Sequence, residues 1–337
     1  MTDTLVASPP TGQEPHPRRI SSSGGLSDLL FRHFLQAAGV TVLIITGAVG
    51  LFLLFRSTLA IRVQKTKFLT TQQWQPDVHR FGIAAIMFGT VVIALVAITV
   101  STPLAVLAAL WISEVAPPFL KRIAIALVDL MFAIPSVVFG LWGLFYLQGH
   151  LIGVARWFAT WFAWIPIFKV SHFNPTNPLT SASVFTASTF MAGMVVGLMI
   201  APIQCSIMRE VFSQAPVGER EGALALGATR WGMIRTVVLP FGKGGMIGAT
   251  MLALGRALGE TIAVVLIISP AYKISWHVLH SGAISVSALI ENLYSDASKF
   301  GLSALFAAGL TLFITTPIVN FAAATIVARS RSGAQSD

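Results

Sequence analysis

The 337-residue sequence contains few charged residues and a single cysteine. Charged residues make up 10% of the chain against 55% hydrophobic residues, and the mean hydropathy is +0.79. A soluble globular domain carries about 25% charged residues. Cys205 alone allows neither an internal disulfide nor a thiolate metal cluster. The shortage of charge excludes a soluble domain and predicts an integral membrane protein.

The sequence also lacks the common motifs of ATP hydrolysis and hydrolytic catalysis. Gly242-Lys243 is followed by Gly244 and lacks the earlier glycine of a Gly-x-x-x-x-Gly-Lys-[Ser/Thr] phosphate-binding loop. No nucleophile elbow or metalloprotease motif is present. His277 and His280 have no third metal ligand nearby in the sequence. We expect no catalytic residue, no metal site and no cofactor in this chain, so energy for its function must come from a partner.

Long apolar runs recur along the chain. About 20 apolar residues suffice for a helix to cross a bilayer. The pattern predicts an all-α polytopic fold with six spans, at residues 36–55, 83–111, 123–147, 186–208, 246–269 and 303–328. We expect residues 1–35, rich in Ser, Pro and Gly, to form a largely disordered tail, and residues 329–337 to form a second tail.

The segment 148–185 departs from the pattern of uncharged apolar runs. Arg156 and Lys169 interrupt it, Trp157, Trp161 and Trp164 lie between them, and it ends in a Pro- and Asn-rich stretch. This mixture predicts a helix lying in the membrane interface, with a seventh crossing as the alternative.

The distribution of charge predicts the orientation of the chain. An even number of spans places both termini on one side, and the larger share of Lys and Arg lies on the side of the termini, which favours the cytoplasm. The net charge of +9 fits contact with anionic lipid headgroups or an anionic cargo. No basic run is interleaved with aromatic residues, so nucleic acid is not an expected partner.

Three charged residues fall inside the predicted spans. Arg256 and Glu260 lie near the middle of 246–269, and four residues along a helix place both on one face, where they can pair. Charges at this depth normally face a bundle interior or an aqueous pathway. The alternative is a static ion pair that fixes helix packing. Asp129, about two turns inside 123–147, either lines the pathway or has a structural role.

The connection 209–245 is charged, unlike the other loops. Ala223, Leu224, Leu226 and Gly227 can share an apolar face while Glu219, Arg220 and Arg230 stay solvated, which predicts a short amphipathic helix outside the membrane. Gly227 is expected to end this helix or permit a turn. Pro240 is expected to bar a straight continuation into the next span. An ordinary solvated loop is the alternative.

This connection resembles the EAA loop of ABC importer permeases. The likeness consists of Glu221-Gly222-Ala223, Gly227 and Val237-x-Leu239-Pro240, with Gly222 and Val237 departing from the usual Ala and Ile. Further stretches resemble the phosphate-specific permeases of PstC type: Phe88-Gly89-Thr90, Ile112-Ser113-Glu114-Val115-Ala116-Pro117, Ala133-Ile134-Pro135-Ser136-Val137-Val138-Phe139-Gly140-Leu141-Trp142-Gly143 and Gly255-Arg256-Ala257-Leu258-Gly259-Glu260-Thr261-Ile262-Ala263-Val264.

The resemblance implies a type I ABC importer permease that moves phosphate across the cytoplasmic membrane, with both termini inside. It implies a second permease (PstA type), two ATPase subunits (PstB type) that bind the ATP, and an external phosphate-binding protein (PstS type). The residues it implies for ATPase coupling are Glu221, Gly222, Ala223, Gly227, Leu239 and Pro240. A permease for sulfate or molybdate, or an ATP-independent channel or phosphate-sensing scaffold, remain the alternatives.

The chemistry of an oxyanion assigns roles to the charged pair. The guanidinium of Arg256 can give two parallel hydrogen bonds to one anion. Phosphate keeps a proton near neutral pH, whereas sulfate keeps none. An ionised Glu260 can therefore accept a hydrogen bond from phosphate and repel sulfate.

Overall fold

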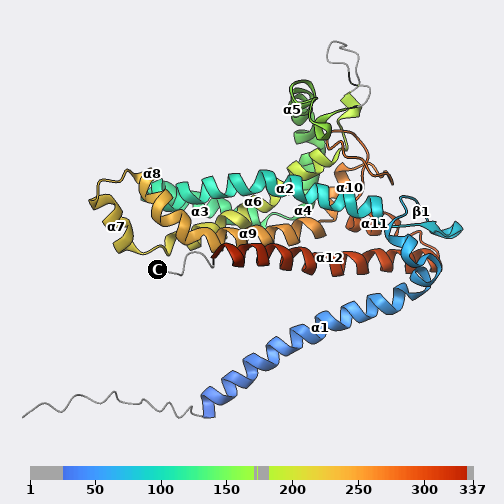
Figure 1. Cartoon of the computed structure of the whole chain (residues 1–337), viewed down its shortest axis with the longest axis horizontal. Coiled ribbons are helices and arrows are strands. Elements are labelled where there is room, and N and C mark those ends of the chain that lie inside the picture. The colour runs from blue at the N-terminus through green and yellow to red at the C-terminus, as the bar shows by residue number, and fades with distance from the viewer. Residues whose placement is uncertain (1–25, 171–172, 174–181, 332–337) are drawn as a thin grey trace, which may run out of the picture. The chain divides into compact units, whose positions relative to one another are not determined.

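The computed structural model describes residues 26–170, 173 and 182–331, most of which are helical (Figure 1). Six helical stretches among them are long and apolar enough to cross a membrane, which confirms the predicted all-α class. They are Asp28–Leu69, Ala84–Val115, Ser136–Trp161, Thr189–Ser213, Arg230–Gly259 and Lys299–Ala322. One small antiparallel hairpin, β1 (Trp74–Gln75) and β2 (Arg80–Phe81), pairs Trp74 with Phe81.

The chain divides into two units, residues 1–49 and residues 50–337. Helix α1 (Leu26–Gln64) begins ten residues before the predicted span, so the expected tail of 1–35 is helical from Leu26 onward. Asp28 in its first turn favours that early start through the helix dipole. Residues 1–25 and 332–337, which hold the rest of the two expected tails, lie outside the described residues.

In the second unit four long helices run along one another (Figure 1). They are α2 (Ala84–Leu110), α6 (Thr189–Ser213), α9 (Leu239–Gly259) and α12 (Lys299–Arg331). Helix α6 is the most enclosed, with 72% of its membrane-length window buried. A Cβ at Gly193 would lie 2.5 Å from Val96 Cγ1, and one at Gly197 would lie 2.9 Å from the Ala97 carbonyl oxygen. The two glycines therefore let α6 approach α2 closely.

The predicted span 123–147 is divided in the structure. Helix α3 (Pro118–Ala133) ends at an extended Ile134, and the chain resumes as α4 (Ser136–Trp142), a π-helical turn η4 (Gly143–Leu147) and α5 (Gln148–Trp161). Pro135 causes the break, because the residue before a proline avoids the helical conformation.

The membrane-length helix here is Ser136–Trp161, so residues 148–161, expected in the interface, continue a span. A short 3-10 helix η5 (Pro166–Phe168) follows. Residues 171–172 and 174–181 of the segment lie outside the described part of the chain, in whose remainder no seventh helix of membrane length occurs.

Pro240 does not bend the chain away from the next span, contrary to the prediction. Helix α8 (Arg230–Met233) continues through a π-helical turn η7 (Ile234–Val238) into α9, and the combined helix Arg230–Gly259 is of membrane length. The Leu239 N–H bonds the Ile234 carbonyl five residues back. This wider turn accommodates Pro240 at the start of α9, where its missing N–H costs no regular hydrogen bond.

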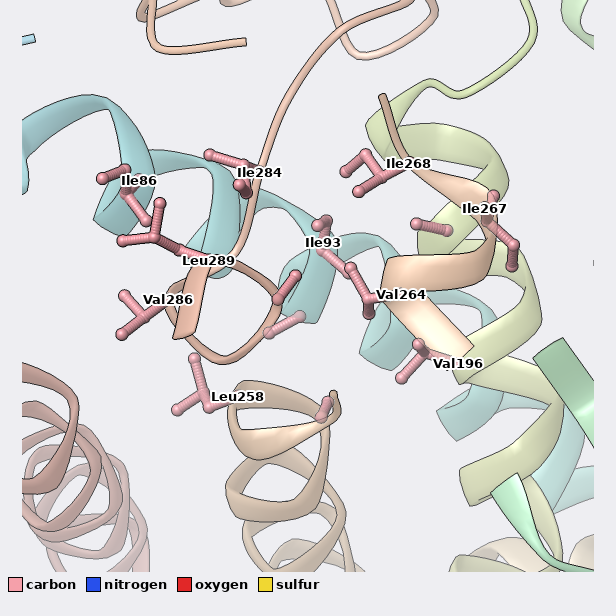
Figure 2. Close-up of a cluster of buried hydrophobic side chains, with 14 of the residues drawn as sticks. Ile86, Ile93, Val196, Leu258, Val264, Ile267, Ile268, Ile284, Val286 and Leu289 are labelled. Atoms are coloured by element: carbon pink, nitrogen blue, oxygen red, sulfur yellow. The ribbon is translucent and has the colours of Figure 1, made fainter. Parts of the chain in front are cut away.

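The expected span 246–269 is also not one helix. Helix α9 ends at Gly259, Glu260 is extended (φ −65°, ψ 126°), and a short helix α10 (Ile262–Ile267) follows. A non-helical segment then leads to α11 (Val286–Leu293). Figure 2 shows the buried cluster that joins these pieces to α2 and α6; its labelled members are Ile86, Ile93, Val196, Leu258, Val264, Ile267, Ile268, Ile284, Val286 and Leu289.

Candidate functional site

Arg256 and Glu260 do not form the predicted ion pair. Arg256 is exposed in the last turn of α9, whereas Glu260 is 9% exposed and lies beyond the helix end. No ion pair joins these two described residues. The prediction assumed a continuous helix. Because the backbone at Glu260 is extended, the four positions between the residues no longer place both side chains on one helix face.

Glu260 instead organises the break between α9 and α10. Its backbone oxygen accepts a 2.7 Å hydrogen bond from Ser287 Oγ in α11. Its carboxylate oxygen Oε1 lies 3.5 Å from the backbone nitrogen of Ala263, in the first turn of α10. A buried carboxylate normally has a cationic partner, and within the described residues Glu260 has none.

Asp129 lies on a different helix from the break between α9 and α10. It is exposed on α3, a helix without buried residues. No hydrogen bond or ion pair links Asp129 to Arg256 or Glu260, all of which are described.

The predicted helix in the charged connection is confirmed as α7 (Val217–Ala225), which contains Glu221, Gly222 and Ala223. Gly227 follows it with φ +88°, the left-handed conformation that ends helices. Leu239 and Pro240 begin α9. Helices α7 and α8 occupy one end of the bundle, and α10, α11 and β1 occupy the opposite end (Figure 1).

Helix α7 and the turn after it expose apolar side chains. Val217 is 66% exposed, Leu224 44% and Leu226 92%. None of the three belongs to a candidate membrane span. Exposed apolar side chains this close together in the chain are candidates for a contact with another protein.

An ion pair that sequence reasoning missed joins α7 to α2. Arg220 Nη2 lies 3.2 Å from Glu114 Oε1, and Arg220 Nη1 donates to Glu114 Oε2 at 3.3 Å. Arg220 Nη2 also donates to the backbone oxygen of Phe212 in α6. Glu114 lies in the π-helical turn η3 (Trp111–Val115) that ends α2. The side chains are 20% and 5% exposed, so this two-point contact is largely shielded from water. The expectation that Arg220 stays solvated was therefore wrong, because the carboxylate that buries it lies 106 positions away in the sequence.

Neither partner is conspicuous alone in the sequence. Glu114 occurs in the stretch Ile112-Ser113-Glu114-Val115-Ala116-Pro117, and Arg220 directly precedes the Glu221-Gly222-Ala223 stretch, but 106 positions separate the two. The one available signal was a lone carboxylate at the end of a span.

Comparison with known proteins places the chain among transporters. Residues 101–332 match the family model described as binding-protein-dependent transport system inner membrane component. The chain is 36% identical over 308 residues to the phosphate transport system permease protein PstC 2 of Mycobacterium tuberculosis, covering 90% of this chain and 93% of that protein. It is 34% identical over 296 residues to the phosphate transport system permease protein PstC of Mesorhizobium japonicum, covering 87% and 88%.

A solved structure shares the fold. It is a bacterial ABC transporter involved in the import of the acidic polysaccharide alginate, with a TM-score of 0.56 and 16% identity, covering 90% of this chain and 98% of that chain. The common architecture is that of an ABC importer permease.

Proposed function

Because the chain belongs to the family of binding-protein-dependent transport system inner membrane components, we propose that it is the permease subunit of an ABC importer that carries inorganic phosphate across the cytoplasmic membrane. The main support for this proposal is the 36% sequence identity to a phosphate permease over about nine tenths of both chains. Six apolar helices and the family make the chain a multi-pass inner membrane protein.

The surface on α7 is the docking site for a separate ATPase. The chain has no phosphate-binding loop of its own and needs no cofactor, so ATP is bound by two partner subunits of PstB type. Leu226, with 92% of its surface free, is the most prominent apolar group available to them. The ATPases are cytoplasmic, which places α7 and both chain termini on that side.

The Arg220–Glu114 pair carries the motion of α7 into the membrane. ATP-driven closure of the ATPases displaces α7, and the ion pair passes the displacement to the end of α2. Helix α2 packs on α6 along its length through the close contacts at Gly193 and Gly197. The movement then opens the pathway to one side of the membrane at a time.

The break after α9 forms part of the phosphate pathway. Arg256 is exposed on this chain, and a homologous second permease of PstA type covers it in the assembled transporter, with Arg256 facing the route between the two subunits. The buried carboxylate of Glu260 accepts a hydrogen bond from protonated phosphate and repels the fully ionised sulfate. Asp129, on α3, completes the proposed pathway from a separate helix, since no described hydrogen bond or ion pair joins it to Arg256 or Glu260.

An external phosphate-binding protein of PstS type delivers the substrate to the end of the bundle opposite α7. The test is uptake of labelled phosphate by proteoliposomes that contain this chain, the second permease, the ATPase and the binding protein. We expect uptake that requires ATP and resists excess sulfate or molybdate. Competition by either anion would indicate a permease for another oxyanion, and uptake without ATP or ATPase would indicate a channel.

A further inference from the structure

The non-helical segment 269–285 between α10 and α11 carries a group of basic and polar side chains. Lys273, Ser275, His277 and His280 fall within eight positions of one another. The segment follows α10 and leads into α11, so it belongs to the end of the bundle opposite α7 (Figure 1). Nothing in the coupling mechanism uses these residues.

Helix α2 holds this segment in place through three consecutive residues. The ring of Phe88 packs edge-on against Trp276, with 4.7 Å between centroids. A Cβ at Gly89 would lie 2.3 Å from the Ile284 carbonyl oxygen, so only glycine admits the segment at this distance. Thr90 Oγ1 accepts a 3.0 Å hydrogen bond from the backbone N–H of Val286. The stretch Phe88-Gly89-Thr90 therefore fixes the segment against α2.

The other side of the segment is fixed by backbone hydrogen bonds. The Val278 N–H donates to the Ile167 carbonyl, and the Val278 carbonyl accepts from the Phe190 N–H and from Thr189 Oγ1, each at 3.0 Å. The Ser281 N–H donates to the Val184 carbonyl at 2.9 Å. Because these contacts hold the segment on both sides, the backbone that carries the basic side chains has a defined position.

The segment lines an open cavity of about 410 Å³. A much smaller space of about 10 Å³ shares part of this lining, and Phe88, Gly89 and Thr189, at the start of α6, also line it. In the described part of the chain no Asp or Glu lines either space. The residues lining both are Lys273, Ser275, His277, His280 and Gly282.

Two polar groups of the cavity, Lys273 and Ser275, can donate hydrogen bonds to an anion. Lys273 is exposed and carries three N–H donors. Ser275 Oγ accepts the His277 backbone N–H at 3.3 Å, which leaves its own proton free to donate. His280 Nδ1 lies 2.8 Å from the Ser281 carbonyl oxygen, so that nitrogen carries a proton and donates it to the carbonyl. This bond fixes the ring in the lining but offers the anion no donor, because a neutral imidazole carries one N–H. The volume exceeds that of one ion and leaves room for water, which occupies about 30 Å³ per molecule.

A second cavity at the same end has the opposite character. It measures about 480 Å³ and is lined in part by Trp74, Asp77, Tyr272 and Asp296. Its carboxylates disfavour an anion, so the two neighbouring cavities differ in the charge they accept.

We propose that the cavity formed by Lys273, Ser275, His277 and His280 is an external binding site for a tetrahedral oxyanion. It receives phosphate from outside and retains it at the mouth of the pathway before the anion passes between the helices. The inference rests on the proposed function for the identity of the anion and for the outward direction of this end. The charge, the hydrogen-bond donors and the volume of the cavity favour an oxyanion but do not distinguish phosphate from other oxyanions.

The direct test is protection of Lys273 from an amine-acylating reagent, with modification quantified by mass spectrometry in the assembled, nucleotide-free transporter. Lys299, exposed at the start of α12 and outside both cavity linings, is the internal control. We expect inorganic phosphate to slow acylation of Lys273 about tenfold without changing Lys299. An acylation rate of Lys273 that phosphate leaves unchanged would overturn the proposal. So would equal protection of Lys273 by chloride at matched ionic strength.

A variant series adds a transport readout. Lys273→Gln is expected to lower uptake at subsaturating phosphate about tenfold, Lys273→Arg to retain most of it, and Lys299→Gln to leave it unchanged. Lys273→Gln that transports like Lys299→Gln would count against the site. Protection of Lys273 does not require transport, so protection without ATP-driven uptake would refute the proposed function and leave the site standing.

Discussion

Arg220 and Glu114 lie 106 positions apart in the sequence and meet in a two-point ion pair, with N–O distances of 3.2 and 3.3 Å. Arg220 belongs to α7, outside the candidate membrane spans, and Glu114 ends the membrane helix that starts at Ala84. The pair is thus a direct connection between the surface proposed for the ATPase and the helix bundle. Helix α2 in turn holds the proposed external site through Phe88, Gly89 and Thr90.

Breaking this pair is expected to uncouple ATP hydrolysis from transport. Glu114→Gln removes one charge and leaves the Arg220 guanidinium with its bond to Phe212, at a cost of about 1–3 kcal/mol. We expect assembled complexes that hydrolyse ATP but take up phosphate at least tenfold more slowly, measured on the same proteoliposomes.

Glu219→Gln, an exposed position on the same helix, is the matched control and should leave uptake unchanged. Arg220→Lys keeps the charge but not the two-point geometry, and should fall between the wild type and Glu114→Gln. Normal coupled uptake by Glu114→Gln would show that the pair has no transmitting role.

The exposed side chain of Leu226 is expected to be required for binding of the ATPase. Leu226→Glu places a charge where the partner would bury an apolar group, and should abolish co-purification of the ATPase with the two permeases. Leu226→Met retains the apolar contact and should retain the complex. Co-purification of Leu226→Glu at wild-type level would place the docking surface elsewhere.

Gly227 is expected to matter for its backbone conformation alone. Its φ of +88° disfavours any side chain, and a Cβ there would meet nothing within 4 Å. Gly227→Ala should therefore strain the turn by about 1–2 kcal/mol and reduce coupled uptake, while the isolated ATPase is unaffected. Gly222→Ala, in the helical part of α7 with equally open surroundings, should be tolerated. Equal behaviour of the two variants would remove the turn from the coupling mechanism.

Glu260 is expected to be required for transport and dispensable for assembly. Glu260→Gln preserves the shape of the side chain and an oxygen that can approach the Ala263 N–H, so the complex should keep its thermal stability while phosphate uptake is lost. Arg256→Ala removes an exposed side chain and should also assemble. Failure of both variants to assemble would favour a packing role for the two residues.

Much of the fold could be predicted because it depends on local composition. Apolar runs of bilayer length predicted six membrane helices, and an apolar face with Ala223 and Leu224 beside a solvated Glu219 predicted the short helix α7. Gly227 as its terminator followed from the conformational freedom of glycine alone.

The breaks in the helices could not be located in this way. Residues 246–269 carry no charge apart from Arg256 and Glu260, and the interruption at Glu260 is held by Ser287, 27 positions later. Pro135 lies inside the apolar run 123–147, and the length of that run predicted one span where the structure has a break between α3 and α4. Long-range contacts therefore decided both the position of Glu260 and the loss of its expected pairing with Arg256.

The most direct test of the central claim is the ATPase activity of the reconstituted complex, measured with and without phosphate-loaded binding protein. The account predicts hydrolysis that phosphate stimulates in the wild type, with stimulation lost in Leu226→Glu because the ATPase no longer docks on α7. An ATPase rate that phosphate-loaded binding protein does not change would contradict a phosphate importer coupled through this helix. Stimulation that persists in Leu226→Glu would contradict it as well.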